Sequence, residues 1–313
     1  MRTLFFAMLI VGAAAVAAQA DWNEGDLYKM HWPQLPDLGQ NGMDVFCSPG
    51  APEEVVFDPM YGNIILPAIP QKMLADDFLC TAGGPITDIH LWGSWWEDRI
   101  PQETALPGVV NPITFTLSIW SDLPADQSGT GYSMPISRLW SANFGPGTYA
   151  ERVYADGLQE GFYNPNQVGE WPPPQMVFGM DTVCWQYNFD IPADEAFQQT
   201  EGEIYWLSVE ANYTLREVSV EHDPYGGPST ILVDEYYWGW KTSESDHFND
   251  DAVYRDYFEE FPFPGEWGEW IEMYHPYTGE SMDLAFVITP EPATMTLLGL
   301  GLIGLVAKRR KKN

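Results

Sequence analysis

The sequence predicts an all-β fold, an antiparallel β-sandwich that is jelly-roll-like, with a signal helix at the N-terminus and a transmembrane helix at the C-terminus. Three observations support this fold class. Short apolar runs recur from residue 73 to residue 288, several with period-two alternation. The 26 prolines and 28 glycines fall mainly between these runs, where they form turns and interrupt helices. Helical periodicity is nearly absent outside the two ends, and no repeat has solenoid or propeller spacing.

Residues 1–20 have the features of a secretory signal peptide. They contain one charge, Arg2, an apolar run over residues 4–18, and the small-residue cleavage site Ala18-Gln19-Ala20. We expect export through the Sec translocon and cleavage by signal peptidase before Asp21. A retained N-terminal anchor is the alternative.

Residues 21–71 are rich in proline and turn residues. They are predicted to form an extended lead segment that lies over the main domain, with one short strand at residues 55–57. The alternative is a partly flexible linker.

Residues 72–289 are predicted to form the sandwich domain. The first expected strands are residues 73–81, 86–96 and 113–120. The third has the cleanest alternation, with four apolar side chains on one face: Ile113, Phe115, Leu117 and Ile119. Further strands are expected at residues 136–141, 183–189, 204–211, 236–241 and 284–288.

The last 24 residues combine three features in order. Pro290-Glu291-Pro292 is followed by an apolar run at residues 293–307 and by a basic end that includes Lys308, Arg309 and Arg310. Fifteen helical residues span roughly 22 Å, less than the ~30 Å hydrocarbon core, but the basic side chains can extend toward the interface. The basic end should stay cytoplasmic. A plain C-terminal membrane anchor is the alternative.

This order and spacing resemble the PEP-CTERM sorting signal. The resemblance implies recognition by an exosortase, with cleavage near Pro290-Glu291-Pro292. It also implies an intermediate tethered to the inner membrane, followed by release to the cell surface or extracellular matrix.

The body of the chain also resembles a family. Residues 74–80 (LADDFLC), 86–96 (ITDIHLWGSWW), 115–126 (FTLSIWSDLPAD) and 204–211 (IYWLSVEA) are similar to an uncharacterised β-rich domain of secreted bacterial proteins with such tails. The resemblance implies the fold and assigns no catalytic residue.

The charge of the body excludes some partners. Arg2 and five tail residues account for six of the 14 Lys and Arg, and Glu291 is the one acid of 45 that lies outside residues 21–289. Such an acidic body disfavours nucleic acid and anionic lipid, and favours solubility or cation binding. With 45% hydrophobic and 15% aromatic residues, it is nevertheless predicted to fold.

Four tryptophans are candidate glycan contacts. In residues 86–96, Ile89, Leu91 and Trp95 share one face, while Trp92 and Trp96 share the other with Asp88 and His90. Trp238 and Trp240 share a face of another strand. Aromatic rings stack on sugars while carboxylates bond the hydroxyls. The alternative is that these tryptophans belong to the core.

Calcium is a candidate cofactor, and no other cofactor is expected. Calcium takes six to eight oxygen ligands, and an acidic run contains Asp246, Asp250 and Asp251. Asp76, Asp77 and Asp122 could add oxygens from elsewhere in the chain. No EF-hand spacing is present, so a solvated acidic surface is the alternative.

The three cysteines allow one disulfide in an exported protein. Cys80 and Cys184 are the expected pair because both flank strand-like runs. No serine-nucleophile, nucleotide-binding or zinc motif is present, and paired carboxylates are too numerous here to indicate a glycosidase.

These observations predict an exported, non-catalytic surface or matrix protein that binds or packs with exopolysaccharide. A secreted glycan-active hydrolase or lyase, and a calcium-stabilised structural envelope protein, are the two alternatives.

Overall fold

The computed structural model describes residues 33–58, 61–101, 108–165, 177–221, 230–244, 248–258, 266–276 and 278–289. The predicted signal peptide and sorting tail lie outside these residues. Within the described part of the chain, no helix is long and apolar enough to cross a membrane.

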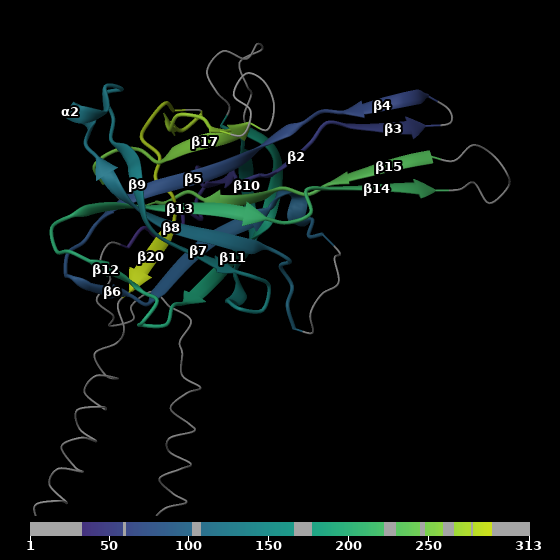
Figure 1. The fold of residues 1–313 in the computed structure, drawn as a ribbon. Helices are drawn as coiled ribbons and strands as arrows, with labels where there is room; N and C mark the ends of the chain where they lie inside the picture. Colours follow the sequence, from purple (N-terminus) through teal and green to yellow (C-terminus); the bar gives the residue numbers. More distant parts are fainter. Residues whose placement is uncertain are drawn as a thin grey trace, which may run out of the picture.

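Two large sheets form the body of the protein (Figure 1). The eight-stranded sheet consists of β2 (Pro49–Ala51), β5 (Ile69–Leu79), β8 (Thr114–Leu123), β9 (Met134–Phe144), β13 (Ile204–Asn212), β17 (Val253–Phe258), β18 (Glu266–Trp267) and β19 (Ile271–Glu272). The six-stranded sheet consists of β1 (Met43–Phe46), β7 (Asp88–Trp95), β10 (Ala150–Tyr163), β11 (Val177–Asp190), β16 (Trp238–Lys241) and β20 (Phe286–Thr289). The predicted all-β sandwich is therefore confirmed.

The remaining elements are short. Three two-stranded sheets pair β3 (Glu54–Asp58) with β4 (Gly62–Leu66), β6 (Gly84–Ile86) with β12 (Phe197–Gln199), and β14 (Arg216–Glu221) with β15 (Thr230–Glu235). The helical turns are η1 (Trp96–Asp98) and α2 (Ala125–Ser128).

An aromatic-rich core lies between the two large sheets. Phe115 of β8 packs against four rings, with centroids 5.1–5.3 Å away: Tyr149, Tyr187, Phe189 and Trp238. The alternation predicted for residues 113–120 is confirmed, because Ile113, Phe115, Leu117 and Ile119 are all fully buried in this core. Tilted and edge-on ring pairs of this kind add stabilisation beyond the buried area.

The six-stranded sheet closes on itself. β7 pairs with β11, β11 with β10, β10 with β1, β1 with β16, and β16 pairs back with β7. These five strands form a ring, in which β1 and β10 are the parallel pair. One face of the ring contributes to the aromatic core. Side chains of the other face are turned toward one another, and this decides the environment of the candidate site.

The predicted lead segment is part of the fold. β1 lies inside the ring between β10 and β16, and Gln34 and Pro36 form bridges to Phe286 and Ser243. The prediction that residues 21–71 lie over a separate domain is therefore wrong for the part from Pro33 onward. Only the short strand at residues 55–57 was expected, and it is present as β3.

Two hairpins project from the body in the same direction (Figure 1). They are β3–β4 and β14–β15. Their bases are joined, because Arg216 at the start of β14 donates a hydrogen bond to the carbonyl of Pro67 just after β4, at 3.3 Å.

Candidate functional site

Four charged side chains lie on four consecutive strands of the ring. They are Asp181 of β11, Glu160 of β10, Asp44 of β1 and Lys241 of β16, and we call them the charged layer. Asp44 lies opposite Lys241, and Glu160 lies opposite Asp181. Oxygens of the three carboxylates come within 4.8 Å of one another. Each of the four side chains is at most 2% exposed.

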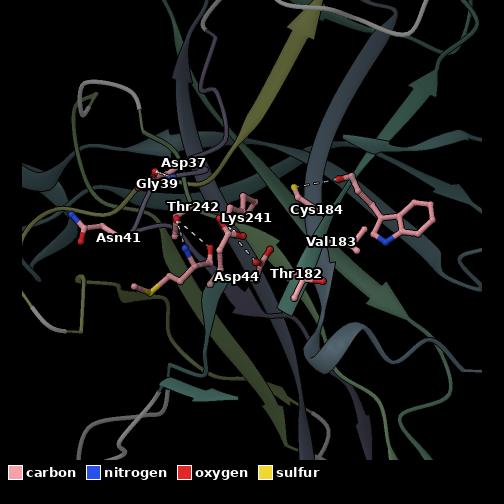
Figure 2. A network of polar contacts seen from close by, with 12 residues as sticks. Asp37, Gly39, Asn41, Asp44, Thr182, Val183, Cys184, Lys241 and Thr242 are labelled. Atoms are coloured by element: carbon pink, nitrogen blue, oxygen red, sulfur yellow. Dashed lines mark hydrogen bonds and ion pairs between the residues drawn. The ribbon is translucent and has the colours of Figure 1, made fainter. Parts of the chain in front are cut away.

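Lys241 neutralises only part of this charge. Its Nζ lies 3.6 Å from Asp44 Oδ2 and forms a close ion pair with Glu160 Oε2. Figure 2 shows Lys241 beside Asp44, with Thr242 and Cys184 nearby. Among the described residues, Asp181 forms no ion pair, and the Ser94 hydroxyl is its hydrogen-bonding neighbour. Three carboxylates therefore share one ammonium group.

Local backbone features bring these residues together. Between Asp156 and Glu160 the β10–β11 register shifts, and Gly157 adopts the left-handed φ of 82° in this bulge. On β16, a Cβ at Gly239 would lie 2.8 Å from Asp44 Cβ and 2.9 Å from Phe162 Cζ. Glycine is therefore required for the strands of the ring to approach one another here.

Apolar side chains occupy both sides of the charged layer. One group contains Trp92, Cys184, Ala285 and Val287, and the other contains Phe46 and Phe162. On β7, Ser94 belongs to the same face as Trp92, and its fully buried hydroxyl lies beside Asp44 and Asp181. The layer is thus enclosed within the protein.

Burial controls the protonation of the layer. Desolvation raises the pKa of Asp181 to about 9, and Asp44 and Glu160 add to this rise, while Lys241 opposes it. Burial also raises the pKa of Glu160 to about 7 and that of Asp44 above its ordinary value. For Lys241, burial alone would lower the pKa, but the neighbouring Asp44 and Glu160 raise it. Chemically, the arrangement can retain protons or hold a cation, and its enclosure keeps a polymer substrate away.

Three of the predicted glycan contacts are core residues. Trp92, Trp238 and Trp240 are fully buried. Trp238 Nε1 donates to Tyr187 Oη at 3.1 Å, and Trp240 Nε1 donates to the carbonyl of Ala285 at 2.7 Å. No sugar can stack on these three rings, so the prediction that they bind glycan is wrong, and the core alternative is correct.

The fourth tryptophan is partly covered. Trp96 is half-buried, and its ring packs edge-on against Tyr237 with centroids 5.3 Å apart. It extends the apolar group that contains Phe46 and Phe162.

Of the residues predicted to bind calcium, the two that are described accept hydrogen bonds from other parts of the chain. Asp246 lies outside the described residues. Asp251 accepts a hydrogen bond from the Met282 amide at 2.7 Å, and Asp250 accepts bonds from the amide and the hydroxyl of Ser133. Within the described part of the chain, the acids whose oxygens converge closely enough for a metal are Asp44, Glu160 and Asp181 instead.

A second acidic group contains Asp77, Asp122 and Asp250, which the sequence also offers as possible calcium ligands. Asn249 Nδ2 donates to Asp77 Oδ2 at 2.6 Å and to Asp250 Oδ2 at 3.4 Å. Burial raises the pKa of Asp77 well above its ordinary value, with Asp283, Asp122 and Asp250 adding to the rise. Asp122 accepts a hydrogen bond from Trp206 Nε1 at 2.8 Å and is half-buried.

The expected disulfide is absent. All three cysteines are free and buried. Cys80 belongs to the aromatic core between the sheets, whereas Cys184 belongs to the apolar group with Trp92 on the other face of its sheet. The prediction of a Cys80–Cys184 disulfide is wrong because the two thiols lie on different faces.

None of the four residues of the charged layer was identified from the sequence. They are distant along the chain, and each comes from a different strand. One signal was available, because Lys241 ends a predicted strand in a body with very few basic residues. A lone lysine at the end of an aromatic strand indicates a buried partner acid, although it does not say which one.

Comparison with protein families gives the class of the chain. The family model described as "Domain of unknown function (DUF7901)" matches residues 30–289, and the chain belongs to this family. The PEP-CTERM protein-sorting motif matches residues 289–311, which include Pro290, Glu291, Pro292, Lys308, Arg309 and Arg310. No curated protein and no solved structure matches the chain. The protein is therefore an exported, cell-surface-directed protein with an exosortase sorting signal.

Proposed function

We propose that the protein is a non-catalytic component of the cell surface or extracellular matrix that associates with exopolysaccharide. In this proposal, the Sec translocon exports it and signal peptidase removes residues 1–20. The C-terminal helix then holds it in the inner membrane until exosortase cleaves the tail. The sorting motif supports this route.

The observation that carries the proposal is the exposure of two aromatic rings on one projecting hairpin. Phe57 of β3 is 68% exposed, and Tyr61, just before β4, is 79% exposed. Glu54 on the same hairpin is exposed as well. Flat rings stack on sugar faces, and carboxylates bond sugar hydroxyls. The glycan contact is thus assigned to β3–β4 rather than to the buried tryptophans.

Affinity electrophoresis tests this assignment. The protein, purified in the form that cells export, is run through gels containing neutral or acidic polysaccharides. We expect retardation in at least one glycan, and loss of retardation in the double variant Phe57→Ala, Tyr61→Ala. Tyr274→Ala is the matched control, because Tyr274 is 48% exposed outside the hairpin. No retardation in any gel, or equal loss in the control, would contradict the proposal.

Packing of the protein with itself belongs to the same proposal. The exposed pair Val55 and Ile65 lies across β3–β4, and Val218 and Val220 are exposed on β14. Projecting apolar surface of this kind marks interaction sites. In light scattering, we expect the double variant Val218→Asp, Val220→Asp to self-associate less than the wild-type protein. The melting temperature of the variant should equal that of the wild-type protein.

A glycan-active hydrolase or lyase is the second candidate, and the second acidic group favours it. Burial raises the pKa of both Asp77 and Asp122; Asp77 is fully buried, so the half-buried Asp122 is the carboxyl that a glycan would meet, and glycosidases use one protonated and one ionised carboxyl. Release of reducing or unsaturated ends from a polysaccharide panel, lost in Asp77→Asn, would support this activity. No turnover on the panel would remove it.

A further inference from the structure

The charged layer of the ring carries an excess of negative charge. When all groups are ionised, Asp44, Glu160 and Asp181 outweigh Lys241 by two charges. Each of these side chains is at most 2% exposed, so bulk solvent screens the excess only weakly. Removing an ion from water costs several kcal/mol even after relaxation of the protein. A buried layer of this kind requires either additional protons or an additional cation.

The distribution of contacts shows where the compensation is missing. Lys241 pairs with Asp44 and Glu160, whereas the fully buried Asp181 forms no ion pair among the described residues and has only the neutral Ser94 hydroxyl as a hydrogen-bonding neighbour there. Asp181 is directly opposite Glu160 across the β10–β11 ladder, and like charges at such positions destabilise a sheet. The uncompensated side of the layer is therefore the side of Asp181.

The donor atoms suit a hard divalent cation. Three carboxylates supply up to six oxygens, and one oxygen of each comes within 4.8 Å of the other two; calcium takes six to eight oxygen ligands. Ser94 adds a fully buried hydroxyl beside Asp44 and Asp181. A single divalent ion would supply the two missing positive charges.

We propose that Asp44, Glu160 and Asp181 bind one calcium ion inside the ring, on the side of the charged layer away from Lys241. The ion joins β1, β10 and β11 and stabilises the fold. Magnesium binds more weakly, because it demands a stricter geometry and retains water that the enclosed layer has little room for. This site is independent of the proposed glycan contact on β3–β4.

Metal content and thermal stability test the proposal. The protein, purified in the form that cells export, is freed of metal with EDTA and then loaded with CaCl2 or MgCl2. Because the layer is enclosed, loading is done both by incubation and by refolding from urea. We expect one bound calcium per chain by mass spectrometry. The melting temperature should rise by roughly 5–10 °C at a calcium concentration about a hundredfold above Kd.

Asp181→Asn is the key variant, because it keeps the shape of the side chain and removes one ligand charge. We expect it to lose the bound calcium and the response of the melting temperature. In EDTA it should melt no lower than the wild-type protein, because the cost of keeping this buried carboxyl protonated is gone. Glu160→Gln should also lose calcium, which keeps the test decisive if one variant fails to fold.

Two control variants locate the ion. Asp126→Asn removes an exposed acid of α2, and Asp250→Asn alters the acidic group near Asp77. Both should keep calcium and its stabilising effect. Loss of calcium in Asp250→Asn alone would overturn the proposal and place the ion at the acidic run. Absence of calcium in the wild-type protein after both loading procedures would also overturn it, and would mean that protons balance the layer.

Discussion

The raised pKa of Asp181 predicts how stability depends on pH in the absence of metal. Its pKa is about 9 in the folded protein and about 4 in an unfolded chain. Between these values the folded state holds a proton that the unfolded state has lost, so stability falls as pH rises. Asparagine at position 181 cannot titrate and removes this contribution.

The size of the effect follows from linkage. One proton difference changes the free energy of unfolding by about 1.4 kcal/mol per pH unit. From about pH 6 to about pH 8, the wild-type protein should therefore lose about 3 kcal/mol more stability than Asp181→Asn. Other buried acids, such as Glu160 and Asp77, contribute to both proteins, so the comparison isolates Asp181.

Urea unfolding followed by tryptophan fluorescence measures this difference. Both proteins are unfolded in EDTA at several pH values, and Asp126→Asn serves as the control because its removed acid is exposed. The control should follow the wild-type protein. Parallel pH dependences of the wild-type protein and Asp181→Asn would refute the reasoning, because they would show that Asp181 is ionised in the folded state.

Four further predictions concern the fold. Gly239→Ala should destabilise the protein by roughly 1–3 kcal/mol in urea unfolding, because its Cβ would overlap Asp44 and Phe162. Gly145→Ala is the control, because its Cβ would meet open space, and its stability should be close to that of the wild-type protein. Lys72→Met should lower the free energy of unfolding by about 3–5 kcal/mol, because it leaves the buried Asp256 without the ammonium group that lies 2.6 Å away. The double variant Lys72→Met, Asp256→Leu should recover most of this stability. Phe115→Ala should cost about 3–5 kcal/mol by opening the aromatic core, and a melting temperature close to that of the wild-type protein would contradict the packing described here. The three buried cysteines should not react with a thiol reagent in the folded protein. After unfolding, all three should react without addition of a reductant, and detection of one thiol per unfolded chain would instead indicate a disulfide.

Strands with one buried face could be predicted from the sequence, because their side chains alternate. Residues 113–120 are the clearest example, and from Thr114 onward they lie in β8. β10 was not predicted. Most of its side chains are exposed or half-buried, so the sequence AERVYADGLQEGFY has no apolar face from which a strand could be recognised. β17 was missed because its aromatic residues lie within a stretch that was interpreted as an acidic run.

The sequence by itself determined the fold class, the sorting signal and which side chains share a face of a strand. It did not determine what covers each face. Trp92 does share a face with His90, as predicted, but the ring formed by β7, β11, β10, β1 and β16 encloses that face. The closure depends on pairings between distant parts of the chain, such as Asp44 with Lys241. Only the tertiary structure therefore decided that the expected glycan platform is core, and that single acids on β1, β10 and β11 meet around one lysine.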